Sequence, residues 1–246
     1  MLLRQCGEAL AAADSSVIHE AQAAAPEDWT HYPHGEVYDS RHHTQYFFHR
    51  HPRISRSRPE GPPEFGHFHL FLRGEGMPPG ATPLVFPDAA VANAPLPRQS
   101  APLKRGSRDE LCHLAGVAID EAGRPTRLFT TNRWVTGETW YRAEDVIRML
   151  DRFAPAGNLP LLDAWLGALV CLFTPEIAVL HRRRDKTIAD WRWRRPSDPF
   201  EDCRLEITSS CDIDLEARLA AIIDPVPAAP RRPVPDLPRM AEGWGV

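Results

Sequence analysis

The strongest constraint on the fold is a set of short runs rich in aromatic and β-branched residues. Residues 44–51 and 64–73 are two such runs, and residues 110–119 and 125–131 are joined by the turn-forming sequence DEAGRP. Runs of this kind are typical of β-strands, and the short connection predicts an antiparallel hairpin. Residues 203–209 alternate between apolar and polar side chains in the same way. The sequence therefore predicts an antiparallel sheet of about five strands.

The stretches around these runs show the spacing of helices. Residues 2–23 repeat apolar residues every three or four positions, and residues 159–173 are apolar almost throughout, which is typical of a buried helix. Further helices are predicted over residues 141–154, from Thr174 to about Trp193, and over residues 214–223. Four or five helices packed on an antiparallel sheet make an α+β fold.

Proline-rich stretches delimit the domain. Residues 74–109 contain seven prolines, so we expect a surface excursion there that is either a lid or partly disordered. Residues 224–246 are again rich in proline and are expected to have no fixed structure. Residues 31–43 are expected to form a loop with a short extended piece. The sequence thus predicts a single α+β domain over residues 1–223, followed by a disordered tail.

Charge and cysteine content restrict the partners and the compartment. The formal net charge is −4, which gives no overall attraction to nucleic acid or to an anionic membrane. The longest apolar run, residues 169–173, is too short to span a bilayer. The five cysteines form no C-x-x-C pair and their number is odd, so we expect a cytoplasmic protein without a disulfide framework. The oligomeric state stays open.

Histidine is concentrated in one part of the chain, because eight of the 11 histidines lie between residues 31 and 69. Side chains alternate along a strand, so each His-x-His pair, His49 with His51 and His67 with His69, shares a face. If the two strands pair, their facing Cβ atoms come within ~5 Å of each other. His113 on the next strand could join them. The predicted metal ligands are therefore His49, His51, His67, His69 and His113.

The chemistry of imidazole suggests what such a cluster does. Neutral imidazole binds zinc, iron and copper well. Buried imidazoles without a metal or a hydrogen-bond partner are costly, because each carries polar nitrogen atoms that must be satisfied. The cluster therefore favours a divalent transition metal, iron, zinc or copper, as the cofactor. Two other interpretations stay open: the histidines face solvent, or they form a hydrogen-bonded network without a metal.

A second polar block, NRWVTGETW, covers residues 132–140 and follows a predicted strand. Strand ends and the turns after them commonly carry site residues. Arg133 could hold a carboxylate or phosphate through two hydrogen bonds, and Glu138 could be a metal ligand or a general base. Alternatively, Arg133 pairs with a neighbouring acid, and Glu138 stabilises the start of a helix. The basic run at residues 181–195 is interpreted as solvated helix surface rather than as a nucleic-acid patch.

Several of these segments together resemble a bacterial family described as a domain of unknown function. They are QYFFHRH, EFGHFHLFLR, LCHLAGVAID, LFTTNRWVTGETW and EDCRLEI. The resemblance covers roughly residues 30–220, and the His-x-His and NRWVTGETW segments are distinctive. It implies that these segments belong to one structural unit, and it implies no particular activity.

Two functions of different classes fit these features. In the first, the chain is a metal-dependent enzyme, hydrolytic or oxidative, in which three of the histidines bind the metal and leave one position open. Glu138 would then be the base, Arg133 would bind a small anionic substrate, and residues 74–109 would cover the site. In the second, the chain is a metal-free binding module for an anionic small molecule or a partner protein. Metal content distinguishes the two.

Overall fold

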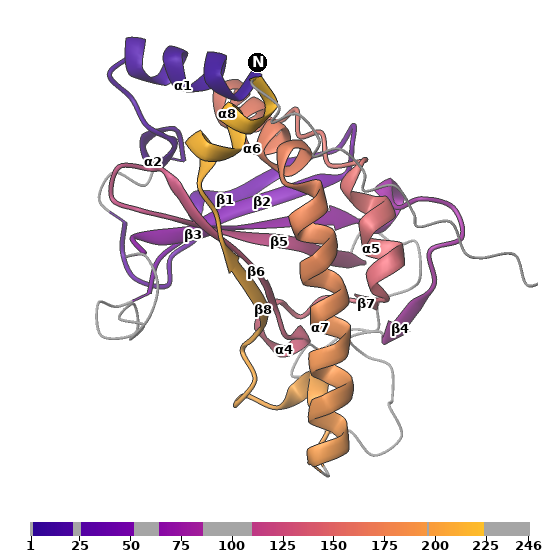
Figure 1. Ribbon diagram of the computed structural model, residues 1–246. Coiled ribbons are helices and arrows are strands. Elements are labelled where there is room, and N and C mark those ends of the chain that lie inside the picture. Colours follow the sequence, from indigo (N-terminus) through magenta and orange to yellow (C-terminus); the bar gives the residue numbers. More distant parts are fainter. Residues whose placement is uncertain (1, 22–25, 52–63, 86–109, 196, 224–246) are drawn as a thin grey trace, which may run out of the picture. The chain divides into compact units, whose positions relative to one another are not determined.

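A computed structural model describes residues 2–21, 26–51, 64–85, 110–195 and 197–223. Its internal contacts divide the chain into two compact units, residues 1–214 and 215–246. The first unit holds the sheet and the helices that cover it (Figure 1), and the described part of the second is helix α8 (Leu215–Ile223). The tail that was predicted to be disordered, residues 224–246, lies outside the described residues.

The core of the first unit is a six-stranded antiparallel sheet with the strand order β1-β2-β3-β5-β6-β8. The strands are β1 (Tyr32–Asp39), β2 (Thr44–His49), β3 (Gly66–Arg73), β5 (Leu111–Ile119), β6 (Pro125–Thr131) and β8 (Ile207–Asp212). The predicted α+β class is confirmed, with one strand more than the five expected. Strands β2, β3, β5 and β6 lie where the aromatic and alternating runs predicted them.

The additional strand, β1, corrects the loop that was predicted for residues 31–43. Its sequence contains Pro33 and Gly35, and both residue types disfavour strands. They are tolerated because β1 lies at the edge of the sheet, where its pairing with β2 is irregular between Tyr32 and Val37. Residue pattern alone does not reveal an edge strand of this kind.

Two other predicted elements have different boundaries. The predicted helix over residues 2–23 is two helices, α1 (Leu2–Ala12) and α2 (Val17–Glu20). Between them Asp14 has a φ of 49°, and the Ser16 side chain accepts the backbone N–H of His19 as an N-cap. The strand predicted at residues 203–209 begins only at the start of β8, because Asp202 first closes a turn with the backbone N–H groups that follow it.

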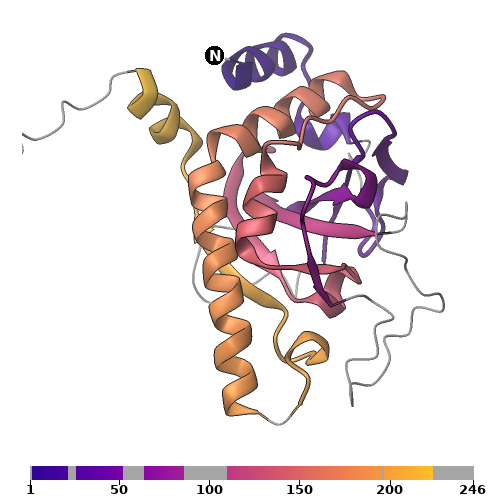
Figure 2. The ribbon, with the colours of Figure 1, turned by 90° about the vertical axis from the view of Figure 1, so that its right-hand side faces the viewer.

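Three helices cover one face of the sheet, α5 (Ala143–Leu150), α6 (Pro160–Leu172) and α7 (Thr174–Arg194), as Figures 1 and 2 show. Phe68 of β3 contacts Trp165 of α6, and the Tyr46 hydroxyl donates to Asp163 of α6 at 2.7 Å. Helix α1 packs against α6. The two consecutive helices predicted from residue 159 onward are therefore confirmed. The α5 helix is shorter than predicted.

Residues 74–85 are the described part of the predicted proline-rich excursion. They contain the 3-10 turn η1 (Gly74–Gly76) and the short strand β4 (Pro83–Val85). Strand β4 pairs with β7 (Trp140–Tyr141) in a separate two-stranded sheet. This part of the excursion is thus ordered, and residues 86–109 lie outside the described residues.

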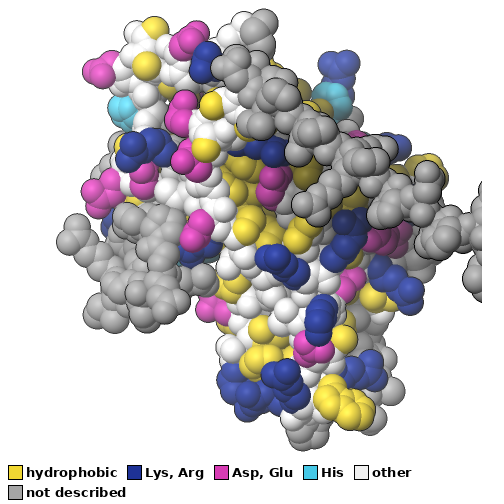
Figure 3. All heavy atoms as spheres, viewed as in Figure 1, with side chains coloured by type: hydrophobic (Ala, Val, Ile, Leu, Met, Phe, Trp, Pro, Cys, Tyr) yellow, Lys and Arg dark blue, Asp and Glu magenta, His cyan; other side chains and the backbone are white. Residues whose placement is uncertain are grey.

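The cysteines, the basic run and the apolar helices lie outside the strands of the large sheet, except for Cys112 on β5 and Cys211 on β8. None of the five cysteines is joined to another by a disulfide in the structure. Most charged side chains of the basic run at the end of α7 are exposed, whereas Ile188 is buried. Figure 3 shows Lys and Arg side chains gathered at the lower end of this face, where α7 ends. In the described ranges no helix by itself has the length and apolarity to cross a bilayer, and α6 and α7 meet that test only as a pair bent by 70°.

Candidate metal centre

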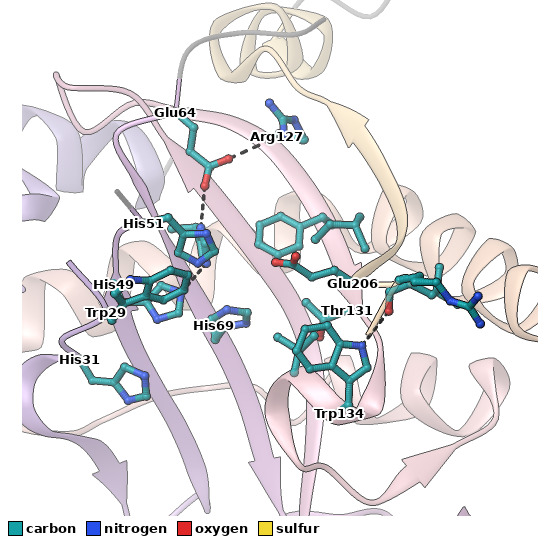
Figure 4. A pocket seen from close by; sticks show the side chains of 16 residues that line it. Trp29, His31, His49, His51, Glu64, His69, Arg127, Thr131, Trp134 and Glu206 are labelled. Atoms are coloured by element: carbon teal, nitrogen blue, oxygen red, sulfur yellow. Dashed lines mark hydrogen bonds and ion pairs between the residues drawn. The ribbon is translucent and has the colours of Figure 1, made fainter. Parts of the chain in front are cut away.

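The histidines lie on the face of the sheet opposite α5, α6 and α7. Strands β2 and β3 pair so that His49 is opposite His67 and Phe47 is opposite His69. Phe68, between the two histidines of β3, points to the helices instead. A cavity of about 640 Å³ opens over the histidine face (Figure 4). Its walls are formed by Trp29, His31, His49, His51, Glu64, His67, His69, Arg127, Phe129, Thr131, Trp134, Val135, Arg204, Leu205, Glu206 and Ile207.

Three imidazoles meet at one end of this cavity. One ring nitrogen from each of His49, His51 and His67 lies within 4.8 Å of the other two. The Nε2 atoms of His49 and His67 are 2.7 Å apart. A tetrahedral ion with metal–nitrogen bonds of ~2.0–2.1 Å holds its ligand nitrogens about 3.3 Å apart, so these two must separate by roughly 0.6 Å to share an ion. Rotation of the side chains can supply that change, and the cluster could hold a metal.

Glu64 orients one of the three imidazoles. Its Oε1 is 2.6 Å from Nδ1 of His67, and its Oε2 is 3.7 Å from Nη1 of Arg127. When the Nδ1–H group of His67 donates a hydrogen bond to Glu64, Nε2 of the neutral ring carries no proton, and its lone pair faces His49. Burial opposes ionisation of Glu64, but the hydrogen bond with His67 and the charges of His67 and Arg127 outweigh it and lower the pKa of Glu64. Metal-binding histidines almost always have such a partner on the second nitrogen.

Replacing Glu64 by alanine is expected to weaken metal binding by ~10–100-fold, because His67 loses the contact that fixes its ring and its tautomer. The affinity for Zn²⁺ is measured by competition with a coloured chelator. Glu121→Ala, which removes an exposed carboxylate from the turn between β5 and β6, is the matched control and should bind as the parent does. An unchanged affinity in Glu64→Ala would show that Glu64 does not support a ligand.

The electrostatics of the cluster favour neutral imidazoles. Burial lowers the pKa of His49 to about 2, with further contributions from the neighbouring His67, His51 and His31. Burial likewise lowers the pKa of His69 well below its ordinary value. Neutral imidazole is the form that binds metal ions. His49 therefore needs to release no proton at neutral pH in order to act as a ligand.

His69 and His113 lie beside the cluster and are bonded to each other. Nδ1 of His69 is 3.0 Å from Nε2 of His113, and Nδ1 of His113 is 3.3 Å from the hydroxyl of Thr131. Burial lowers the pKa of His113 to about 3. Of the five predicted ligands, the structure thus brings three into one cluster and places two in an adjacent hydrogen-bonded pair. Their part in binding a metal stays a prediction.

Arg133 and Glu138 are not among the residues that line the cavity. Arg133 is buried and forms an ion pair with Glu201, which is the alternative that the sequence left open. Glu138 is buried and accepts the backbone N–H of His113 at 2.7 Å. Burial raises the pKa of Glu138 to about 7, against the opposing charge of Arg184. Their predicted roles as anion clamp and base stay predictions.

Trp29 and His31 also line the cavity, and both come from outside the predicted strands. Trp29 has a φ of 67°, a left-handed conformation that is rare for a bulky residue, and its ring stacks on His51 with 4.3 Å between centroids. His31 stacks on Phe47 at 3.7 Å, and its Nδ1 is 2.8 Å from Glu36. No local spacing signals that these residues meet the histidines.

A family model described as a domain of unknown function, DUF6969, matches residues 2–213. The match confirms the resemblance seen in the sequence and extends it to the first helix. It spans every strand of the large sheet, so the three histidines and the NRWVTGETW block belong to one family unit. No curated protein and no solved structure matches the chain.

Proposed function

The chain belongs to the DUF6969 family, and we propose that it is a metal-dependent enzyme whose ion is held by His49, His51 and His67. The observation that carries this proposal is the convergence of three ring nitrogens at the end of an open cavity. Three histidine ligands leave a fourth position for water or substrate, as in catalytic sites. Glu64 would supply the supporting contact that such ligands need.

The identity of the ion decides the reaction class. Imidazole ligands suit zinc, iron and copper. Zinc would supply activated water for hydrolysis, whereas iron or copper would supply redox chemistry for oxidation. The protein residues would bind the ion, hold the ligand rings in place and shape the cavity. Phe129, Leu205 and Ile207 add apolar wall to that cavity, which favours a small organic substrate.

A metal-free binding module is the second candidate, and one observation favours it. The 2.7 Å contact between the Nε2 atoms of His49 and His67 is a hydrogen bond that two neutral imidazoles make without an ion. With Glu64 accepting from the other nitrogen of His67, both ring nitrogens of His67 have partners without an ion. In this case the cavity would bind a small molecule or a segment of a partner protein.

Metal content separates the two candidates. Untagged protein is purified from cells supplied with iron, zinc and copper, and its metal content is measured by inductively coupled plasma mass spectrometry. A variant that combines His49→Ala and His51→Ala is measured beside it. We expect close to one equivalent of one transition ion in the parent and its loss in the variant. His19→Ala changes an exposed histidine on α2 and should keep the ion. A parent protein that holds no ion, even after reconstitution, would leave the binding module as the function.

A further inference from the structure

The charged side chains of the cavity differ in how they are paired. Besides the histidines, the cavity is lined by Glu64, Arg127, Arg204 and Glu206. Glu64 and Arg127 pair with each other, and Arg204 is held by Asp202 through two hydrogen bonds of 2.7 and 2.5 Å. Within the described ranges, no hydrogen bond or ion pair engages the Glu206 carboxylate. Glu206 is therefore the charged group of the lining that is available to a ligand.

Glu206 projects into the cavity from the wall opposite the three histidines. Figure 4 shows its side chain extending from the segment that precedes β8, with the carboxylate directed across the cavity toward the histidines. Trp134 and Thr131 lie beside it on the same wall. A ligand that enters between the two walls would meet imidazole nitrogens on one side and a carboxylate on the other.

The NRWVTGETW block holds this wall in place. The backbone N–H of Asn132 donates to the carbonyl oxygen of Glu206 at 2.8 Å, and Nε1–H of Trp134 donates to the carbonyl oxygen of Leu205 at 2.9 Å. The Asn132 side-chain amide also donates to the carbonyl oxygen of Pro199 at 2.7 Å. These bonds fix the backbone that carries Glu206. The block thus fixes the position of Glu206.

We infer that Glu206 faces the open position of the bound ion and determines which ligands the site accepts, an inference that rests on the proposed function. A carboxylate accepts hydrogen bonds and repels anions. Compared with a neutral side chain in its place, it favours water and substrates with an O–H or N–H donor, and it weakens the attraction of the doubly charged ion for carboxylates and phosphates. The arginines that could attract an anion are paired with acids. Glu206 therefore shifts the preference of the site toward a neutral, hydrogen-bond-donating substrate and away from the anion predicted from the sequence.

Cobalt and two simple probes test this inference. The visible absorption bands of Co²⁺ in the site report what occupies its fourth position. Azide, an anion, and imidazole, a neutral N–H donor, are titrated into the parent and into Glu206→Gln, both loaded with Co²⁺. Removing the charge should tighten azide binding about tenfold and should not tighten imidazole binding. Glu121→Gln removes an exposed carboxylate outside the cavity and should bind both probes as the parent does.

Each other outcome overturns a different statement. Equal azide affinity in the parent and in Glu206→Gln would overturn the inference, and so would an equal gain in Glu121→Gln. Cobalt-loaded parent whose bands change with neither probe would show that no open position exists, which also overturns it. A parent protein that takes up no cobalt would refute the metal site of the proposed function instead. Circular dichroism confirms that each variant is folded.

Discussion

Replacing His67 by alanine is expected to lower the affinity for Zn²⁺ by more than about 100-fold and to leave the protein folded. Loss of a residue that only supports a ligand already costs ~10–100-fold. His67 contacts both His49 and Glu64. Its removal therefore deletes one ligand of the ion and leaves the Glu64 carboxylate without its imidazole partner. Its side chain lines the cavity rather than the core under the helices. Isothermal titration calorimetry measures the affinity, and circular dichroism measures the fold.

His69→Ala is the informative companion of this variant. His69 lies on the same strand and lines the same cavity, but its Nδ1 is bonded to His113. We therefore expect a smaller loss of affinity than in His67→Ala. If His69→Ala abolished binding while His67→Ala retained it, the ion would have a different ligand set and the assignment of His49, His51 and His67 would be wrong.

Replacing Phe68 by alanine is expected to have the opposite effect, a loss of stability with the ligands kept. Phe68 lies between His67 and His69 on β3 and points to the other face of the sheet, where it has no exposed surface. Its ring centroid is 5.2 Å from that of Phe48 and 6.3 Å from that of Trp165. Removing a buried phenyl ring costs ~3–5 kcal/mol of unfolding free energy through lost burial and the cavity that remains.

Urea denaturation measures this loss, and metal content is measured on the fraction that stays folded. Trp193→Ala is the control, because this tryptophan is 90% exposed on α7 and its loss should change the unfolding free energy by less than ~0.5 kcal/mol. A change below about 1 kcal/mol in Phe68→Ala would contradict the assignment of this face to the core. The variants of two adjacent residues on β3, His67 and Phe68, thus distinguish a loss of metal binding from a loss of stability.

Strand alternation explains why much of the sheet was predictable. The pattern of β2 and β3 places His49, His67 and His69 on one face and Phe48 and Phe68 on the other, and the structure confirms this division. The sequence only suggested that β2 and β3 pair with each other. This pairing sets His49 opposite His67. By contrast, nothing in the pattern of β3 shows that the nitrogens of His69 and His113 bond to each other, because that depends on the register with β5.

The remaining parts of the site depend on contacts between distant segments. Trp29 reaches His51 from the turn before β1, whereas Glu64 contacts a histidine only three residues further along the chain, His67. The edge strand β1 was hidden by its proline and glycine. The NRWVTGETW block contributes Trp134 and Val135 to the cavity wall, and the backbone N–H of Asn132 and Nε1–H of Trp134 hold the backbone around Glu206. Only the folded chain distinguishes these two roles.

The most direct test of the metal site is X-ray absorption spectroscopy at the edge of the ion that the purified protein retains. A site built from His49, His51 and His67 predicts three imidazole nitrogens at ~2.0–2.1 Å, with one further oxygen or nitrogen ligand in the remaining position. The signal of one imidazole should disappear in His51→Ala, which changes the ligand that lies beyond the end of β2. A first shell that contains sulfur, or oxygen without imidazole, would contradict the assignment.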